Sequence, residues 1–319
     1  MDFDSIENWS RSELTGKKYQ AVVTGTSFYP GSEQGCIRMA RELNIPCVTL
    51  IDSWSNYRQR FLRSHEITLT SAILPTRIAV PDQFAVHEME EAGFPEKILR
   101  IIGQPALDRF ANQASLRGHE ERKTLCSLLK ISFTEPVFAF FSQPISNLYG
   151  PPDTPSYRGY TEYEVLEGLL KHMSLEFPSA TLLVKLHPKE NSQKFKKLLS
   201  QYPNNVQVSE LSEENLVLGA NVVIGMTSIV LVKAYLCGKK VLSLQPNLRG
   251  VDQCVLSRMK LLQTSRNFED LSRELRVTAE TTLSLSTQTN VSHFLVDGKS
   301  VERMLSIIEE AIMDHEYAC

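Results

Sequence analysis

The sequence lacks the cysteine spacings of a metal site or a disulfide framework. Its six cysteines are scattered, with no Cys-x-x-Cys pair and no histidine at metal-ligand spacing. We therefore expect no zinc site and interpret the cysteines as reduced thiols. A Gly-x-Ser-x-Gly elbow, a P-loop, a His-Glu-x-x-His motif and the Gly-x-Gly-x-x-Gly fingerprint are missing as well. The sequence thus shows no nucleophile motif and argues against a nicotinamide-dependent dehydrogenase.

The sequence also lacks an excess of charge of either sign. Lysine and arginine number 34 against 37 aspartates and glutamates, which gives a formal net charge of −3. This balance argues against a protein that binds nucleic acid or coats an anionic membrane. The first residues have neither the basic nor the apolar region of a secretory signal, and the longest apolar stretch, about 216–226, is too short to span a bilayer. We expect a cytoplasmic soluble protein.

Strand-like and helix-like segments alternate over most of the 319 residues, of which 42% are hydrophobic. This length allows about two domains, and the alternation predicts parallel sheets built from right-handed βαβ units. The predicted strands are residues 19–25, 46–52, 77–82, 98–105, 136–143, 181–187, 205–210, 221–225 and 240–246. The predicted helices are residues 32–43, 83–94, 161–177, 194–202, 212–220, 227–238 and 297–313, with a linker at 111–135.

One turn in the second half is a candidate anion site. A predicted strand ends in Gly225, Thr227 or Ser228 is placed to cap the next helix, and Gly238 follows its end. The N–H groups at a helix start attract anions, and ligands bind at the carboxyl ends of strands in open α/β sheets. The alternative is simply a well-capped helix in a doubly wound sheet.

A titratable cluster follows another predicted strand of the same half. Residues 181–187 are largely apolar, and they end in a His-Pro pair followed by Lys189 and Glu190. In a parallel sheet His187 would lie at the same edge as Gly225, where it could donate to a phosphate while Lys189 supplies a charge. The alternative is a strand stop, with Lys189 and Glu190 in solvent. Because proline restricts the preceding residue to extended backbone, we favour the functional interpretation.

The loop after the predicted strand 136–143 is dense in proline, glycine and serine and longer than a plain connection requires. We interpret it as a substrate lid. Its polar candidates are Ser142, Gln143, Tyr149, Arg158, Tyr160 and Glu162. For Glu162 the alternative is a favourable contact with the start of a helix.

The first half has a polar segment of its own after the predicted strand 46–52. It offers an acceptor pocket, or groups that hold an anionic sugar, from Asp52, Asn56, Tyr57, Arg58 and Arg60. The alternative is a surface helix that turns a tryptophan and Phe61 towards the core.

Several segments together resemble the GT-B glycosyltransferase superfamily. They are GMTSIVLVKAYLCGKKVLSL (225–244), KLHP (185–188), RIAVPD (77–82) and GFPEKILRIIGQPALD (93–108). The similarity is to bacterial polysaccharide-biosynthesis members, including CDP-glycerol glycerophosphotransferases, polysialyltransferase-like enzymes and non-hydrolysing UDP-N-acetylglucosamine 2-epimerases. It covers about residues 19–313.

This resemblance implies an α/β protein with two Rossmann-like domains that face each other across a cleft, with a shortened first domain and a C-terminal helix that crosses back. The expected limits are residues 1–120 for the acceptor-side domain, 121–298 for the nucleotide-sugar-binding domain and 299–319 for the helix. The resemblance implies a nucleotide-sugar donor as substrate, a sugar or glycolipid acceptor, no metal and no cofactor.

By position, the resemblance makes Gly225, Thr227 and Ser228 the diphosphate site and His187 a second donor contact. The remaining expected donor contacts are Lys189, Ser142 and Gln143. The expected acceptor or lid residues are Asn56, Tyr57, Arg58, Tyr160 and Glu162. The expected catalytic residues are Asp52, as the base for the acceptor, and His187. Where several sugar-nucleotide families carry a Glu-Ala pair for the ribose, this sequence has Lys233-Ala234, which leaves CMP- or CDP-linked donors open.

We therefore expect a metal-independent glycosyl or glycosyl-phosphate transferase of polysaccharide or glycoconjugate biosynthesis. One alternative is a non-hydrolysing sugar-nucleotide 2-epimerase. The other is a non-catalytic nucleotide-sugar-binding subunit, which the short first domain and Lys233 suggest. No nucleic-acid partner is expected, while a peripheral contact with a membrane, a partner subunit and a homo-oligomer stay open.

Overall fold

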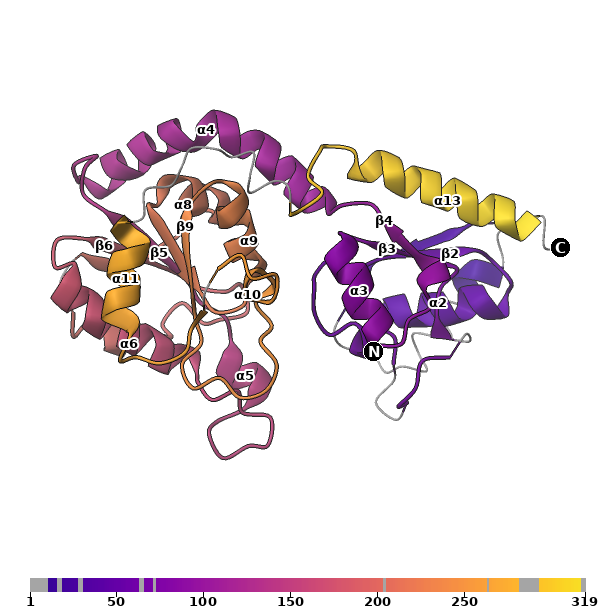
Figure 1. The fold of residues 1–319 in the computed structure, drawn as a ribbon, viewed down its shortest axis with the longest axis horizontal. Helices are drawn as coiled ribbons and strands as arrows, with labels where there is room; N and C mark the ends of the chain where they lie inside the picture. The colour runs from indigo at the N-terminus through magenta and orange to yellow at the C-terminus, as the bar shows by residue number, and fades with distance from the viewer. Residues whose placement is uncertain are drawn as a thin grey trace. The chain divides into compact units, whose positions relative to one another are not determined.

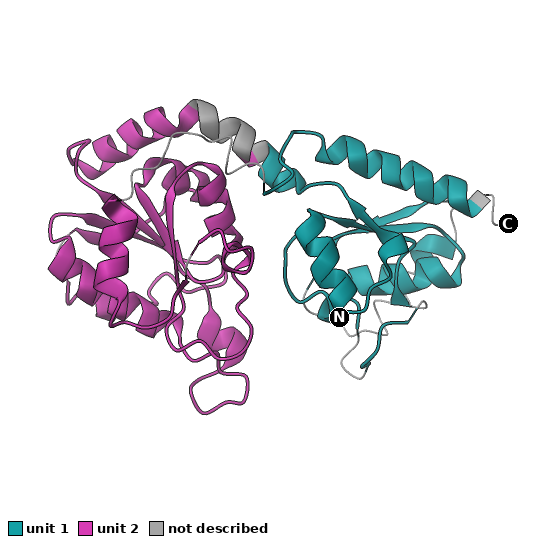
Figure 2. Ribbon diagram, viewed as in Figure 1, with its two compact units in different colours: residues 1–109, 292–319 teal, residues 110–291 magenta. Residues whose placement is uncertain are grey.

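The computed structural model describes most of the chain as two compact units. The described residues are 11–15, 19–27, 31–62, 66–70, 73–202, 205–262, 264–280 and 293–316, without the side chains of 109, 111–116 and 316. Unit 1 comprises residues 1–109 and 292–319, and unit 2 comprises residues 110–291 (Figure 2). The chain therefore leaves unit 1, completes unit 2 and returns.

Unit 1 is built on a parallel four-stranded sheet with the order β1-β2-β3-β4. Its strands are β1 (Val22–Thr24), β2 (Cys47–Leu50), β3 (Arg77–Val80) and β4 (Leu99–Ile101). Its helices include α2 (Ser32–Glu42), α3 (Gln83–Glu91) and α13 (Ser300–Glu316), with 3-10 turns at Arg58–Arg60 and Glu96–Ile98. Figure 1 shows α13 on one side of this sheet and α2 and α3 on the other. Both faces are covered, which explains why β2 and β3 are almost continuously apolar.

Helix α13 packs its apolar face on the middle strands of unit 1. Ile307 and Ala311 form a buried cluster with Val48 of β2, Ala79 of β3 and Ile102. The two helix residues are four positions apart and therefore lie on one face. The expected helix that crosses back to the first domain is confirmed.

Unit 2 is built on a parallel six-stranded sheet with the order β10-β9-β8-β5-β6-β7. Its strands are β5 (Val137–Phe141), β6 (Thr181–Lys185), β7 (Val206–Val208), β8 (Val222–Gly225), β9 (Lys240–Leu244) and β10 (Thr264–Ser265). Its described helices are α4 (Pro105–Leu129, which begins in unit 1), α5 (Ile145–Tyr149), α6 (Glu162–Glu176), α7 (Lys196–Leu199), α8 (Glu213–Gly219), α9 (Ile229–Leu236), α10 (Val255–Arg258) and α11 (Leu271–Glu280).

The core of unit 2 lies mainly between its sheet and the pair α6 and α11, while α4, α8 and α9 lie on the other side (Figure 1). Phe138 and Phe140 of the central strand are fully buried. Burial of such side chains contributes about 1.5–3 kcal/mol each. The expected pair of α/β domains with parallel sheets is confirmed.

Helix α4 corrects the expected linker. It runs without interruption from Pro105 to Leu129, so residues 111–129 belong to a helix and the expected domain limit at residue 120 lies inside it. Proline at the first helical position is compatible with a helix start. Mixed charges occur on exposed helix faces as well as in linkers. The charge pattern of this segment therefore did not distinguish a helix from a linker. The short α5, α10 and β10, and also α11, were not predicted.

Candidate functional site

The candidate site lies at the carboxyl ends of β5, β6 and β8. From β5 the chain continues outwards through β6 to β7, and then returns to place β8 on the other side of β5. Open α/β sheets bind ligands at the carboxyl ends of two neighbouring strands whose connections diverge in this way. The residues that directly follow β5 and β8 include Ser142, Gln143, Thr227 and Ser228.

Gln143 and Thr227 join these two strand ends. Gln143 Oε1 accepts a hydrogen bond from Thr227 N at 2.8 Å, and its Nε2 donates to Thr227 Oγ1 at 3.2 Å. Ser228 is the N-cap of α9, and its Oγ accepts from Val230 N at 3.2 Å. The first N–H groups of a helix have no acceptor within it, and together with the helix dipole they favour an anion at the start of α9.

Gly225 does not border an open space. Its lack of a side chain allows α9 to pack closely against the end of β8. A Cβ atom at this position would lie 3.2 Å from Leu231 Cδ2 and 3.6 Å from Phe141 O. Gly238, by contrast, has φ +66° and directly follows the C-cap Cys237 of α9, as its predicted position requires.

His187 follows β6 and is held at two points. Its backbone N–H donates to Glu190 Oε2 at 2.8 Å, and its Nδ1 accepts from Lys189 N at 3.1 Å. Burial lowers the pKa of His187; Glu190 raises it, whereas Lys189 and Lys194 lower it further. The contact with Lys189 N favours the tautomer whose proton is on Nε2, because a ring nitrogen that accepts a hydrogen bond carries no proton.

Beside His187 lies a buried group of Glu162, Glu190 and Lys194, here called the carboxylate–lysine cluster. The side chains of the two glutamates are 0% exposed and that of Lys194 is 8% exposed. Lys194 Nζ donates to Glu162 Oε1 and, at 2.6 Å, to Glu190 Oε1. A buried charge of this kind is tolerated only when it is paired and hydrogen-bonded.

Two serines complete the carboxylate–lysine cluster. Ser146 N and Oγ donate to Glu162 at 2.8 and 2.6 Å, and Ser142 Oγ donates to Glu190 Oε1 at 3.0 Å. Burial raises the pKa of Glu162, but the hydrogen bonds from Lys194 and Ser146 outweigh it and lower the pKa. Burial likewise lowers the pKa of Lys194, but its bonds to the two carboxylates raise it. The cluster thus ties the end of β5 to the starts of α5 and α6.

The alternative that Glu190 begins a helix in solvent is contradicted by its burial. Lys194 was not singled out from the sequence, although its spacing of four residues from Glu190 was an available signal. Lys189 was expected to contact the donor. Its backbone N–H donates to the His187 ring. Glu162 lies in the first turn of α6, as its helix-start alternative has it, and its side chain is in addition buried and paired with Lys194.

The expected lid is held against the segment that follows β9. Arg249 N donates to Arg158 O at 2.8 Å, and Tyr149 Oη donates to Gln253 Oε1 at 2.9 Å. At Gly159, where φ is +91°, a Cβ atom would lie 1.9 Å from Asn247 O. Only glycine fits this close approach.

Tyr160, predicted at the acceptor or in the lid, is a core residue. It is 1% exposed, and its hydroxyl donates to Gln245 Oε1 at 3.3 Å. Burial raises its pKa. Gln245 in turn donates to Asp252 Oδ1 at 2.8 Å, so a buried polar chain runs along the carboxyl end of β9.

In unit 1, Asp52 and Arg60 organise the ends of β1 and β2. Arg60 is 6% exposed, and its guanidinium donates to Asp52 Oδ1 at 2.8 Å, Ser53 Oγ at 2.8 Å and Thr26 Oγ1 at 2.9 Å. The Asp52 side chain is 59% exposed. Arg60 thus fixes one oxygen of a carboxylate that is open to solvent.

The residues after Asp52 that were expected at an acceptor pocket include two with other partners. Tyr57 is buried, and its hydroxyl donates to Glu88 Oε2 at 2.8 Å. Arg58 donates to Ile67 O at 2.6 Å, and Asn56 has a left-handed φ of +57°. Tyr57 and Arg58 are thus engaged with Glu88 and Ile67 rather than with Asp52.

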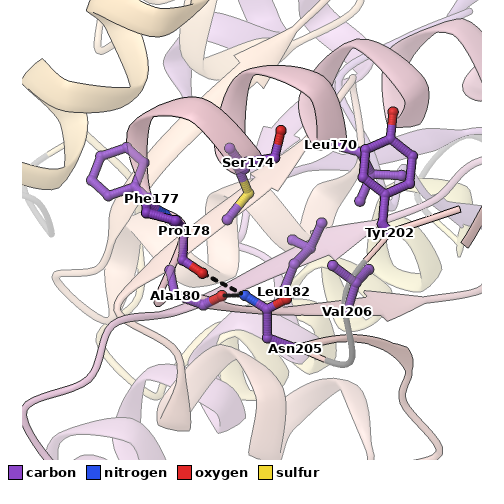
Figure 3. Close-up of a pocket in the computed structure, with 10 residues that line it drawn as sticks. Leu170, Ser174, Phe177, Pro178, Ala180, Leu182, Tyr202, Asn205 and Val206 are labelled. Atoms are coloured by element: carbon purple, nitrogen blue, oxygen red, sulfur yellow. Dashed lines mark hydrogen bonds between the residues drawn. The ribbon is translucent and has the colours of Figure 1, made fainter.

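An apolar cavity of about 70 Å³ lies elsewhere in unit 2, between α6 and the starts of β6 and β7 (Figure 3). Its lining includes Phe177, Leu182, Tyr202 and Asn205. Asn205 Nδ2 donates to Pro178 O at 3.2 Å and to Ala180 O at 2.5 Å. The cavity is at the amino ends of these strands, so it is separate from the candidate site.

Within the described part of the chain, no group of three or more histidine, cysteine, aspartate or glutamate side chains is arranged to hold a metal ion. Nor does any described helix combine the length and apolar character needed to cross a membrane.

No protein-family model matches the sequence, and no curated protein matches it. Solved structures do match. UDP-GlcNAc 2-epimerase from Neisseria meningitidis, bound to UDP-GlcNAc, is 12% identical with a TM-score of 0.66, and the match covers 97% of this chain and 81% of that one. A glycosyltransferase from Rickettsia africae is 12% identical with a TM-score of 0.60, covering 97% and 81%. The wall teichoic acid polymerase TagF is 13% identical with a TM-score of 0.51, covering 98% and 95%.

These similarities extend over nearly the whole chain at low identity, so they establish the fold. The chain has the GT-B-type fold that its sequence led us to expect.

Proposed function

We propose that this chain is a metal-independent glycosyl or glycosyl-phosphate transferase that uses a nucleotide-activated sugar. The observation that carries the proposal is the junction of Gln143, Thr227 and Ser228 at diverging strands, with His187 at the next strand end. The similar structures support it, because one is an epimerase bound to UDP-GlcNAc and another is a wall teichoic acid polymerase. The proposed setting is cytoplasmic polysaccharide or glycoconjugate biosynthesis, with a sugar or glycolipid acceptor.

The proposed donor site stabilises a departing diphosphate with hydrogen-bond donors. The start of α9 supplies backbone N–H groups and the positive end of its dipole. Ser228 Oγ accepts from Val230 N, which leaves its own proton for a phosphate oxygen. His187 supplies its Nε2–H. Donors that are fixed before the reaction, and aimed at developing charge, usually give the largest electrostatic contribution to catalysis.

Asp52 is the proposed base for the acceptor hydroxyl. Its exposed carboxylate is open to a substrate, and its bond to Arg60 fixes its orientation. An Asp52→Asn variant is expected to keep nucleotide binding and lose turnover.

A thermal-shift screen against UDP, CMP, CDP, GDP and ADP tests the donor site. A nucleotide that binds only the folded state raises the melting temperature. Ser228→Ala and His187→Ala are expected to reduce that rise. Ser212→Ala is the matched control, because Ser212 caps α8 and accepts from Asn215 N at 3.1 Å, as Ser228 caps α9. It loses comparable stability, about 1 kcal/mol, and keeps the nucleotide response. If no nucleotide raises the melting temperature, the proposed donor site is wrong.

The second candidate is a sugar-nucleotide 2-epimerase, favoured by the structural similarity to such an enzyme. Incubation with UDP-N-acetylglucosamine separates the two candidates. Formation of the manno epimer supports the epimerase, whereas acceptor-dependent release of the nucleotide supports the transferase. Nucleotide binding without either product supports a non-catalytic binding subunit.

A further inference from the structure

The position of His187 depends on groups outside its own strand. Glu190 Oε2 accepts the His187 backbone N–H at 2.8 Å, while Glu190 Oε1 accepts from Ser142 Oγ at 3.0 Å and from Lys194 Nζ at 2.6 Å. Lys194 is in turn bonded to Glu162. The loop that carries His187 is therefore anchored to β5 and α6 through a fully buried carboxylate.

The imidazole of His187 has a defined proton position. Its Nδ1 accepts from Lys189 N at 3.1 Å, and a ring nitrogen that accepts a hydrogen bond carries no proton. A neutral imidazole has one proton, which must then be on Nε2. Protonation of Nδ1 would place two N–H groups against each other and break the contact with Lys189.

The charges around His187 balance. Lys189 and Glu190 are in its own loop, Lys194 follows that loop, and Glu162 comes from α6. Two lysines and two glutamates thus form the group, and Glu162 joins it through Lys194. Because Lys194 is bonded to both carboxylates, it offsets the charge with which Glu190 favours an imidazolium, and an uncompensated buried carboxylate would favour one more strongly.

We propose that Glu190 and Lys194 are positioning residues for His187: Glu190 holds its loop, and Lys194 offsets the glutamate charges, so that a neutral imidazole with a fixed Nε2–H serves as a hydrogen-bond donor to a phosphate oxygen rather than as a base or a cation. The proton state stands on the contacts of the free protein, while the phosphate role rests on the proposed function. A neutral donor binds an anion without first taking up a proton, so binding of a diphosphate diester is expected to be independent of pH between about 6 and 8.

Long-range ¹H–¹⁵N NMR of the imidazoles in the ligand-free protein tests the proton state. The His187 signals are assigned by their loss in His187→Ala. We expect the Nε2–H tautomer and a titration midpoint below the ordinary histidine value of about 6.5. A protonated Nδ1, or a midpoint above 6.5, overturns the proposal.

Variants of the carboxylate–lysine cluster test the positioning role. Lys194→Met leaves two buried carboxylates without their cation and is expected to raise the midpoint of His187; Lys194→Arg restores it. Glu190→Gln removes the charge that raises the midpoint and is expected to lower it, which gives a second reading if Lys194→Met does not fold. Lys233→Met, which breaks the half-exposed pair with Glu213, is the matched control and leaves His187 unchanged. If the control moves the midpoint as far as the cluster variants do, the positioning role is wrong.

Binding of UDP-N-acetylglucosamine, whose diphosphate diester does not titrate near neutrality, tests the ligand role. His187→Ala is expected to weaken this binding about ten- to hundredfold, as expected for loss of a hydrogen bond to a charged group. Wild-type affinity that falls as the pH rises from 6 to 8 would mean that a cation binds the phosphate, and it overturns the donor role. If the NMR result holds and no sugar nucleotide binds, the proposed function fails while the positioning of His187 stands.

Discussion

Gln143 engages Thr227 with both atoms of its carboxamide, accepting from the Thr227 backbone N–H and donating to its hydroxyl. An uncharged acceptor therefore already occupies one N–H group at the turn where an anion is proposed to bind. Any ligand at this turn binds beside Gln143 or displaces it.

Gln143→Glu places a negative charge beside the start of α9. We expect the melting temperature of the free protein to rise, because a carboxylate near a helix N-terminus contributes about 0.3–1 kcal/mol. Affinity for a sugar nucleotide is expected to fall about tenfold or more, because the carboxylate repels the diphosphate. Calorimetry measures the affinity, and Gln143→Met, which removes the carboxamide without adding charge, is the control. Unchanged affinity in Gln143→Glu would place the diphosphate elsewhere.

Asp82 gives unit 1 a predicted pH dependence. It accepts from Trp54 Nε1 and from Ala85 N, each at 2.8 Å, but burial outweighs these bonds and raises the pKa of Asp82 to about 6. The folded state therefore binds this proton more tightly than the unfolded state, so the contribution of Asp82 to stability is fully present below about pH 4 and is lost as the pH rises through about 6. A shift of about two units corresponds to about 3 kcal/mol.

Urea unfolding of wild type and of Asp82→Asn at pH 4.5 and 7 measures this effect. The quantity compared is the difference between the two proteins in the free energy of unfolding at each pH. In a Trp9→Phe background, Trp54 is the remaining tryptophan, and its fluorescence is expected to titrate near pH 6. A difference between the two proteins that does not change with pH would show that Asp82 is ionised throughout.

Arg122 of α4 is predicted to contribute more to stability than Arg117 of the same helix. It is 6% exposed and donates to three backbone carbonyls, those of Phe133 at 3.1 Å, Gly219 at 3.4 Å and Glu135. Arg122→Met leaves these buried acceptors without a donor and is expected to lower the free energy of unfolding by about 2–4 kcal/mol. Arg117→Met, which breaks half-exposed ion pairs, is expected to cost less than about 1 kcal/mol. Equal losses in urea unfolding would contradict this account.

Two glycine-to-alanine changes are predicted to have opposite signs. Gly159→Ala forces a methyl group against Asn247 O and is expected to lower the free energy of unfolding by about 2 kcal/mol or more. Gly118→Ala in α4 has no heavy atom within 4 Å of the new Cβ and is expected to stabilise by up to about 1 kcal/mol. Limited proteolysis should cleave the loop around residue 159 faster in the first variant only.

The elements that position the site were predictable because each is defined by local sequence. Strand β8 is continuously apolar, Ser228 caps α9, and Gly238 follows its end in a left-handed conformation. The spacing of Lys194 from Glu190 indicated that pair, but the burial of the cluster was not predictable, because it also depends on Glu162 from a different element. The prediction that Tyr160 lies at the acceptor or in the lid was wrong for a similar reason. It follows a segment rich in proline and glycine, yet its hydroxyl has a buried partner in Gln245, which is far away in sequence.

The return of the chain to unit 1 reverses the usual order of assembly during synthesis. Strand β4 ends at Ile101, but α13, which covers one face of the same sheet, begins at Ser300. The ribosome must therefore make all of unit 2 before Ile307 and Ala311 can reach Val48 and Ala79. Domains generally fold as the chain emerges, with the N-terminal one first. Here the sheet that is translated first keeps one face uncovered until the second domain has been completed, so the nascent chain is most exposed to aggregation and to chaperones at its earliest folded element.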